Sequence, residues 1–322
     1  MTHRFRLRLL DFGLLLTFLL PVVMSPRTAA GATGLSVETV SRPIQYLFSH
    51  EGRAIMRYDF APEKYKSYVA ALHPPGGDNV LRDAPFDHLH HHALMYGITV
   101  NGVNFWEEIA GSGVQKSVEI SPPRTTINAS GLPETSFTQT LYWVPASDAF
   151  LPNTNARPFL IESRTVRLVL NPDAHETAVY WTARFRVGPR TNTVVLTGAN
   201  YHGLGLRFAQ EMDASAEHFF PGGKPDLSGN KQDATPHPWE AVTFDRSGKR
   251  CTVAVFGHPA NARGDTSFFS MRSPFAYLSA TQALHREPLV YREGDEFELQ
   301  YLVTVYSEPK SEQQLSARAQ KW

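Results

Sequence analysis

The chain has 322 residues, and its 31 lysines and arginines balance 31 aspartates and glutamates, giving a formal net charge of zero. No block of like charge occurs, which argues against a nucleic-acid partner and against binding to an anionic membrane surface. We therefore expect a small or neutral ligand. The only cysteine, Cys251, excludes an internal disulfide, and its alternating sequence context predicts a buried, inert thiol.

The N-terminus has the features of a signal peptide. Three arginines between positions 4 and 8 precede an apolar stretch from Leu9 to Met24, and small residues with A-x-A-like spacing follow. We predict that residues 1–32 are removed on export to the periplasm or the medium. A retained membrane anchor is disfavoured, because Asp11 interrupts the stretch and a spanning helix needs about 20 apolar residues. No comparable run follows, so we expect no integral membrane insertion.

Residues 33–322 predict a single domain of the all-β class. Apolar and polar residues alternate in many short segments, which is typical of strands with one buried face. The segments predicted as strands are Ile44–Ser49, Ala54–Phe60, Ala93–Val100, Val114–Ile120, Thr135–Val144, Phe159–Leu170, Tyr180–Val187, Val242–Phe244, Thr252–Phe256 and Phe275–Ala280. Closely spaced strands with turn residues between them indicate a large two-sheet antiparallel β-sandwich.

The remaining segments predict a hairpin, a helix and two long loops. Pro288–Tyr306 predicts a β-hairpin with its turn at residues 293–295, and Ser307–Trp322 predicts a short C-terminal helix. Long loops on a sandwich commonly cover a ligand site. We expect this of Pro221–His237, and we interpret Leu151–Pro158 as surface decoration.

The segment Phe86–Gly97 contains four of the thirteen histidines within five residues. If it is extended, His88, His90 and His92 share one face, while Asp87 and His91 share the other. Neutral imidazoles donate, accept or bind metals, so such a group on one strand face predicts a functional site.

The dipeptide Asn101-Gly102 predicts a tight turn that returns the following residues alongside the histidines. Asn104, Trp106, Glu107 and Glu108 follow this turn. Glu107 and Glu108 alternate in direction, so only one of them is expected to be the partner of the histidines, and the other is expected to be solvated.

Two further groups of polar residues lie downstream. The first contains His202, Arg207 and Glu211, and the second contains His258, Asn261, Arg263 and Arg272. The glycines at 203 and 205 do not form a phosphate loop, and we interpret them as relieving crowding in a strand. The arginines, together with the histidines, predict a pocket rich in donors for hydroxyl or carboxylate groups.

These motifs together resemble the bacterial family described as "methane oxygenase PmoA-like". The resemblance rests on Asp87-His88-x-His90-His91, Asn101-Gly102-x-x-Phe105-Trp106, Gly203-Leu204-x-x-Arg207 and His258-Pro259-x-Asn261-x-Arg263 with Arg272. It extends upstream to Arg57-Tyr58, Tyr65-x-x-Tyr68 and Pro74-Pro75-Gly76-Gly77. Ala93 departs from the pattern, since the family often has Arg or Gly after the histidines.

The name of that family does not define an activity. Particulate methane monooxygenase subunits are multi-helix membrane proteins, whereas no spanning helix is predicted after residue 32. The resemblance implies a β-sandwich of the galactose-mutarotase kind and, by analogy, a carbohydrate ligand.

The leading hypothesis is an exported carbohydrate-active enzyme of the epimerase, lyase or hydrolase type that requires no cofactor. An imidazole would act as general acid or base with a carboxylate as its partner, and the predicted catalytic residues are His88, His90, His92, Glu107 and Glu211. The predicted substrate-binding residues are Asp87, His91, Tyr65, Tyr68, Asn104, Trp106, His202, Arg207, His258, Asn261, Arg263 and Arg272.

Two alternatives stay open. One is a metal-dependent, oxygenase-like enzyme in which His88, His90 and His92 hold a divalent metal together with a carboxylate. The other is a non-catalytic protein that binds a sugar or an oligosaccharide in the same pocket.

Overall fold

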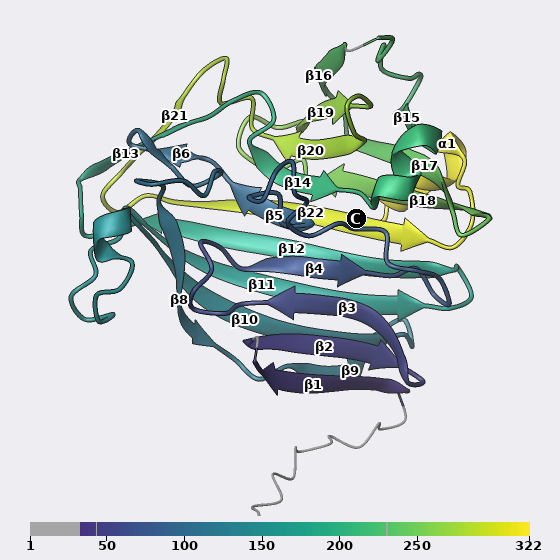
Figure 1. Ribbon diagram of the computed structural model, residues 1–322, viewed down its shortest axis with the longest axis horizontal. Coiled ribbons are helices and arrows are strands. Elements are labelled where there is room, and N and C mark those ends of the chain that lie inside the picture. Colours follow the sequence, from purple (N-terminus) through teal and green to yellow (C-terminus); the bar gives the residue numbers. More distant parts are fainter. Residues whose placement is uncertain (1–32, 43, 230) are drawn as a thin grey trace, which may run out of the picture.

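The computed structural model describes residues 33–42, 44–229 and 231–322. The predicted signal peptide lies outside the described residues. Two large sheets and one small sheet account for most of the described chain (Figure 1). Within these ranges no helix is both long enough and apolar enough to cross a membrane.

The first large sheet has nine strands and carries the site described below. In spatial order they are β1 (Leu35–Ser41), β2 (Ile44–His50), β3 (Arg53–Asp59), β4 (Tyr68–Leu72), β5 (Leu94–Gly97), β14 (Gly203–Arg207), β20 (Tyr277–Thr281), β19 (Ser267–Met271) and β16 (Gln232–Pro236). Gly205 of β14 pairs with Met95 of β5 on one side and with Ser279 of β20 on the other. Segments far apart in sequence are therefore adjacent at the centre of this sheet.

The second large sheet also has nine strands. They are β15 (Glu217–Phe219), β17 (Trp239–Arg246), β18 (Lys249–Gly257), β22 (Glu296–Tyr306), β12 (Glu176–Val187), β11 (Leu160–Asn171), β10 (Pro133–Val144) and β8 (Val114–Ile120), while β9 (Arg124–Ile127) pairs with β10. Trp181, Ala183 and Phe185 of β12 are buried, as the alternation predicts. Cys251 of β18 is also buried, which confirms the predicted burial, and burial raises the pKa of its thiol to about 11.

The small sheet corrects one prediction. It consists of β21 (Leu289–Arg292), β13 (Thr193–Thr197), β6 (Thr99–Val100) and β7 (Val103–Asn104). The predicted turn after β21 is present, but the hairpin is wrong, because β21 pairs with β13 whereas β22 pairs with β12 and β18. Both edges of β22 are already hydrogen-bonded to these two strands. The predicted strand Ala93–Val100 is likewise divided into β5 and β6 at Ile98.

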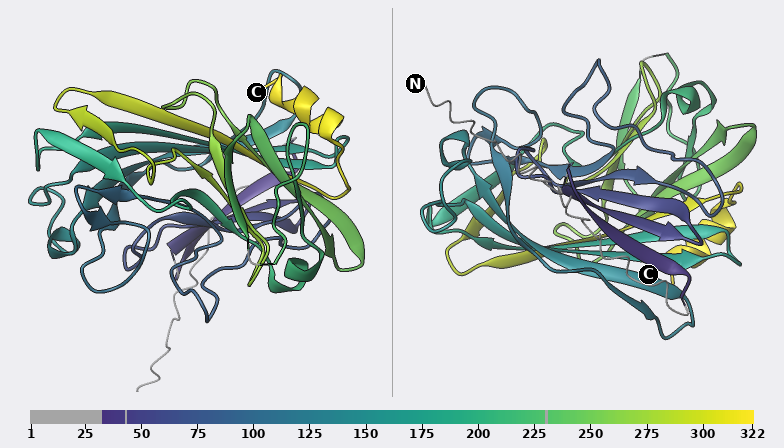
Figure 2. Two further views of the ribbon diagram at one scale, coloured as in Figure 1. Left: turned by 90° about the horizontal axis from the view of Figure 1, so that it is seen from above. Right: turned by 60° about the horizontal axis from the view of Figure 1, so that its bottom comes forward.

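The hydrophobic core lies between the two large sheets, which form separate layers in Figure 2. Aromatic side chains bridge the layers: the ring of Tyr58 on β3 lies 4.8 Å from that of Phe137 on β10, and the ring of Tyr96 on β5 lies 5.9 Å from that of Trp143. These contacts confirm the predicted all-β fold class, a large antiparallel two-sheet sandwich with a short C-terminal helix.

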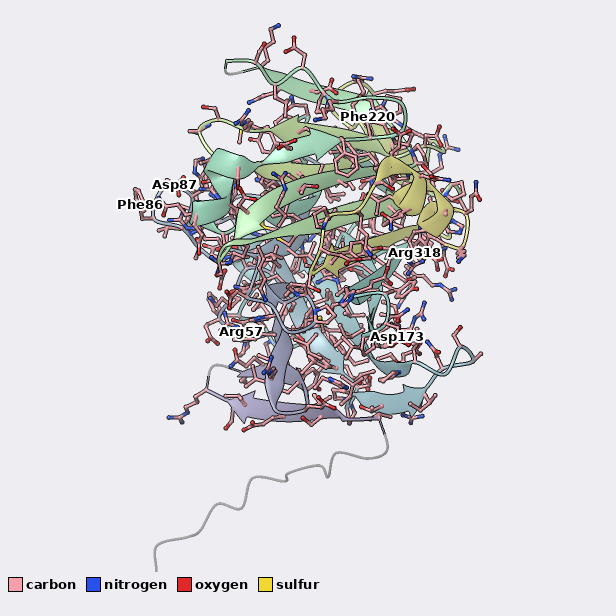
Figure 3. The ribbon with its side chains drawn as sticks, turned by 90° about the vertical axis from the view of Figure 1, so that its right-hand side faces the viewer. Arg57, Phe86, Asp87, Asp173, Phe220 and Arg318 are labelled. Atoms are coloured by element: carbon pink, nitrogen blue, oxygen red, sulfur yellow. The ribbon has the colours of Figure 1, made fainter. Side chains whose placement is uncertain are left out.

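The helix α1 (Glu312–Ala319) covers the outer face of the second sheet, and Figure 3 labels Arg318 within it. Its buried Leu315 belongs to a cluster with Trp239, Phe256 and Leu302. The helix begins later than Glu308-Pro309, because Ser311 is its N-cap and forms a capping box with Gln314. Two short 3₁₀ helices, η1 (Ala146–Asp148) and η2 (Gln210–Ser215), lie in connecting segments.

Candidate functional site

The histidine segment is a turn rather than the predicted strand. The carbonyl of Pro85 accepts a hydrogen bond from the amide of His88, and the carbonyl of His88 accepts one from the amide of His91, both at 2.9 Å. Phe86–His91 therefore folds back between Asp83 and His92, which form an isolated β-bridge. The predicted face shared by His88, His90 and His92 does not exist.

The turn instead brings His88, His90 and His91 together. The ring centroid of His91 lies 4.6 Å from that of His88 and 4.6 Å from that of His90, while His88 and His90 are 5.8 Å apart. A pocket of about 290 Å³ opens beside them. Its volume is near the lower end of the range for small-molecule sites, about 300–1,000 Å³.

The pocket walls come from several distant segments. The side chains that line it are His88, His90, His91, Glu107, Tyr201, Gln232, Phe269, Met271, Pro274, Phe275 and Tyr277. Gln232 belongs to the predicted loop Pro221–His237, so part of this loop does border the pocket. The end of the loop forms β16, which begins at Gln232. Figure 3 labels Phe86 and Asp87 where the histidine turn projects from the molecule.

Trp106 and Glu107 are positioned by the turn at Asn101-Gly102. Both turn residues have positive φ, 48° and 79°, and β6 and β7 pair across them, which confirms the predicted tight turn. The side-chain oxygen of Asn104 then accepts hydrogen bonds from the amides of Trp106, at 2.7 Å, and Glu107, at 3.1 Å. Asn104 therefore holds the backbone of the pocket wall.

Trp106 is buried between the histidine turn and β14. Its ring stacks on that of His202 with centroids 5.1 Å apart, and it meets the ring of His91 edge-on at 6.0 Å. A Cβ at Gly205 would lie 1.9 Å from the hydroxyl of Tyr277 and 2.8 Å from Trp106. The glycine therefore relieves crowding, as predicted.

Burial keeps the imidazoles of His90, His91 and His202 neutral. It lowers the pKa of His90 to about 4 and that of His91 to about 2, and neighbouring positive groups add to both shifts. Burial also lowers the pKa of His202 to about 4. At pH 7 these rings each carry one donor and one acceptor nitrogen and no charge.

His92 points away from the other histidines and is held by two carboxylates. Its Nδ1 lies 2.7 Å from Asp83 Oδ1, and its Nε2 lies 3.0 Å from Glu108 Oε2. Two carboxylate acceptors require both nitrogens to donate, so the ring is an imidazolium. Burial opposes this charge, but the bonds to Asp83 and Glu108 outweigh burial and raise the pKa of His92.

The network around His92 continues on both sides. The ammonium of buried Lys66 donates to Glu108 Oε1 at 2.6 Å and to the carbonyl of Trp106 at 2.9 Å. The hydroxyl of Tyr68 donates to Asp83 at 3.0 Å, and its ring stacks on His92 with centroids 4.3 Å apart. Tyr68 and His92 are thus placed beside the pocket as part of its support.

Arg207 is joined to the histidine turn through Asp87. Its Nη2 donates to Asp87 Oδ2 at 3.0 Å, and the guanidinium lies 3.2 Å from the ring centroid of Phe275. Asp87 Oδ2 also lies 3.1 Å from Nδ1 of His88. Arg207 is therefore joined to the histidine turn, but it stands behind the pocket wall and does not share the pocket with the histidines as the sequence predicts.

Several predicted site residues lie elsewhere. Glu211 pairs with Arg246 and is exposed, and Arg272 donates to the carbonyl of Ala214. Asn261 exchanges two hydrogen bonds with the backbone of Gln300, at 2.8 and 2.9 Å. Arg263 donates to carbonyls of a neighbouring loop. The Nδ1 atom of His258 accepts a hydrogen bond from the amide of Ala260, and the carbonyl of Tyr65 accepts one from the amide of Gln115. None of these six lines the pocket.

The residues do not fit the metal alternative. Both nitrogens of His92 are occupied by carboxylates, so His88, His90 and His92 do not converge on one point. Among the described residues no group of three or more histidine, cysteine, aspartate or glutamate side chains is arranged to hold a metal ion.

Sequence reasoning missed part of the site. Lys66, Asp83 and Glu108 form a partly buried ion network with His92, and Tyr201, Phe275 and Tyr277 line the pocket. Glu108 carried a signal, because it follows the same turn as Glu107. It was expected to be solvated, yet both carboxylates serve the site on different sides. The other residues are ordinary strand or loop residues whose sequence context gives no sign of a shared pocket.

The fold and the site define an all-β sandwich protein with a small pocket lined by histidines and aromatic side chains. The chain belongs to the family of unknown function DUF6807, which matches residues 45–320. This assignment overturns the resemblance to the PmoA-like family, which was wrong. Comparison with curated proteins gives no match.

Similar solved structures include domains of larger glycoside hydrolases. The galactosidase domain of the α-galactosidase-sucrose kinase AgaSK is 10% identical, with a TM-score of 0.49, over 84% of this chain and 42% of that chain. The GH36 α-galactosidase AgaB from Geobacillus stearothermophilus is 12% identical, with a TM-score of 0.48, over 84% and 41%. A glycoside hydrolase family 97 enzyme from Pseudoalteromonas sp. strain K8 is 8% identical, with a TM-score of 0.43, over 85% and 34%.

This chain therefore matches less than half of the length of each of these proteins. At such TM-scores the similarity carries no inference about ligand or activity, which have to be argued from the pocket itself.

Proposed function

We propose that the protein is a carbohydrate-active enzyme that transfers protons on a sugar unit held in the pocket. The observation that carries this proposal is the lining, in which three imidazoles and Glu107 face Tyr201, Phe269, Phe275 and Tyr277. A sugar presents hydroxyl groups at its edges and C–H groups on its faces, so it matches a wall that combines hydrogen-bonding groups with aromatic surfaces.

The acid–base residues of the proposal are His90 and Glu107. His90 is neutral at pH 7 because burial lowers its pKa to about 4, so its free nitrogen accepts a proton. Glu107 is the only carboxylate among the lining residues, and in this proposal its negative charge would stabilise the imidazolium that results. Glu211, which lies outside the pocket, has no place in this mechanism.

This set of groups supports ring-opening epimerisation better than hydrolysis. Glycoside hydrolysis generally uses two carboxyl groups on either side of the bond, whereas the pocket lining contains one. In ring opening, His90 takes the proton of the anomeric hydroxyl while the bond from the anomeric carbon to the ring oxygen breaks. The ring oxygen then receives that proton, and closure on the other carbonyl face reverses the steps, so no proton is consumed.

The test is the interconversion of sugar anomers, followed by NMR over a panel of hexoses and pentoses. The wild-type protein should accelerate it for at least one sugar. Replacing His90 or Glu107 by Gln should each lower the rate about 100-fold or more, the contribution typical of a general acid or base. Glu211→Gln is the matched control and should keep the wild-type rate.

Two outcomes would contradict the proposed function. Binding of a sugar without turnover would identify a non-catalytic binding protein. If the protein neither binds nor converts any sugar of the panel, none of these sugars is its ligand. Export, which rests on the sequence of residues 1–32 alone, remains part of the proposal.

A further inference from the structure

The two cations beside the pocket are each paired with a carboxylate and covered. Lys66 is 1% exposed, and its ammonium lies 2.6 Å from Glu108. Arg207 is 2% exposed, and its guanidinium lies 3.0 Å from Asp87 and is covered by the ring of Phe275. Neither cation lines the pocket, so a ligand held there has no free ammonium or guanidinium to contact.

Among the groups that line the pocket, Glu107 supplies a negative charge. His90 and His91 are neutral at pH 7, because burial lowers both pKa values below that pH. Glu107 is the only lining residue with an acidic or strongly basic side chain, and it is partly buried. Asp87 lies next to His88 and is paired with Arg207, so the two charges of this pair offset each other.

Binding a ligand that carries a carboxylate or phosphate would therefore cost free energy. It would leave water, where it is well solvated, for a site that offers neutral donors and a like charge. An uncharged hydroxyl in the same position exchanges water for imidazole and carboxylate partners without this loss.

We propose that the pocket selects an uncharged sugar unit and discriminates against the corresponding uronate, with Glu107 as the residue that determines this specificity. This inference rests on the proposed function, since it assumes that the ligand is a sugar. It names the class of sugar that the site accepts.

The experiment compares ligand pairs that differ only at C6. Methyl glycosides of glucose and galactose are each matched with the methyl glycoside of the corresponding uronic acid. Methyl glycosides lack a free anomeric hydroxyl, so binding is measured without ring opening. Dissociation constants are determined at pH 7 by calorimetry, in low and in high salt. The neutral member should bind about tenfold or more tightly, and high salt should narrow the difference by screening the repulsion.

Two variants test the cause. Glu107→Gln keeps the size and hydrogen bonding of the side chain but removes its charge, so it should reduce the preference for the neutral ligand to a few-fold or less. Glu119→Gln makes the same change at an exposed position of β8 in the other sheet and should leave the preference unchanged.

The outcomes separate this inference from the proposed function. Equal or tighter binding of a uronate would overturn the selectivity while leaving a carbohydrate enzyme standing. An unchanged preference in Glu107→Gln would overturn the role of Glu107. If neither member of any pair binds, and the free sugars are not turned over, both the proposed function and this inference are wrong.

Discussion

Gly205 determines how closely two aromatic residues of the site approach β14. A Cβ at this position would overlap the hydroxyl of Tyr277, 1.9 Å away, and would press on Trp106 at 2.8 Å. We predict that Gly205→Ala lowers the free energy of unfolding by about 1–3 kcal/mol, the usual cost of overpacking, as measured by urea denaturation. Adding Tyr277→Phe removes the overlapping oxygen and should recover part of this loss.

Gly223→Ala provides the control for that substitution. A Cβ there would meet only the ring edge of Phe220, at 3.3 Å, in a loop outside the pocket. Its effect on stability should stay within about 0.5 kcal/mol. Equal losses in Gly205→Ala and in the double variant would show that Tyr277 is not the residue being displaced.

Single residues also show where sequence reasoning fails. Arg263 and Asn261 are polar residues in the same motif, which suggested binding, but they satisfy backbone groups of neighbouring loops instead. Nothing in a sequence distinguishes an amide that binds a ligand from one that binds a carbonyl, because the difference depends on which segments fold beside it. Gly205, in contrast, was interpreted correctly, since a glycine in a strand usually marks close packing.

At the scale of elements, His92 connects the histidine turn to the segment that follows β7. It bridges Asp83 and Glu108, and Lys66 holds Glu108 from the other side. We predict that His92→Gln lowers the free energy of unfolding by about 2–4 kcal/mol, because it leaves charged acceptors without their cation.

The cost of His92→Gln should depend on pH in a defined direction. Burial opposes protonation of His92, yet its carboxylate partners raise the pKa above the ordinary value of 6.5. A group whose pKa is raised on folding stabilises the folded state. This contribution is complete at a pH below the pKa of the unfolded state, and it disappears as the pH rises through the pKa of the folded state. The difference in melting temperature between wild type and variant should therefore be large at pH 6 and shrink at alkaline pH.

A constant difference across that range would show that His92 is not an imidazolium in the folded protein. The comparison with the variant is needed because His90, His91 and His202 have lowered pKa values. Their contribution has the opposite sign, so the stability of the wild-type protein falls as pH drops below the unfolded value of 6.5.

Elements with regular alternation could be predicted from the sequence, whereas the shape of the histidine segment could not. The strand pattern of β10 and β12 depends on burying one face of a strand, which local sequence records directly. On either side of the histidine turn, Ala84 and Ala93 both have positive φ, a conformation rare for alanine and imposed by surrounding contacts. The turn therefore depends on neighbours that lie far away in sequence.

For the whole molecule, the sequence indicates two packed sheets but not their strand order. The pairing of β21 with β13, and the meeting of β5, β14 and β20, join segments that lie far apart in sequence, and alternation says nothing about such partners. The candidate site depends on that strand order, because its lining residues come from five parts of the chain. The histidine segment and Glu107, both named from the sequence, line the candidate pocket, whereas Tyr201, Phe275 and Tyr277 were not predicted.

One buried ion pair lies on β11 of the second sheet, and its arginine also bonds across the core to the segment that precedes β4. Arg164 on β11 donates to Glu162 at 2.7 Å and, across the core, to the carbonyl of Ser67 at 2.8 Å. Both charged side chains are fully buried, and Glu162 also accepts from the indole of Trp143 at 2.8 Å. Arg164→Met would leave Glu162 as an unpaired anion in the core. We predict a loss of about 3–5 kcal/mol in the free energy of unfolding.

The double variant Arg164→Met with Glu162→Leu removes the stranded charge. Its stability should return to within about 2 kcal/mol of wild type, because replacing a whole buried pair by apolar residues costs far less than breaking it. The control is Arg184→Met, which removes a largely exposed arginine paired with Glu298 and should cost under about 1 kcal/mol. All three are measured by urea denaturation. If the double variant is as unstable as Arg164→Met, the bonds from Arg164 to the first sheet, rather than the isolated charge of Glu162, hold the sandwich together.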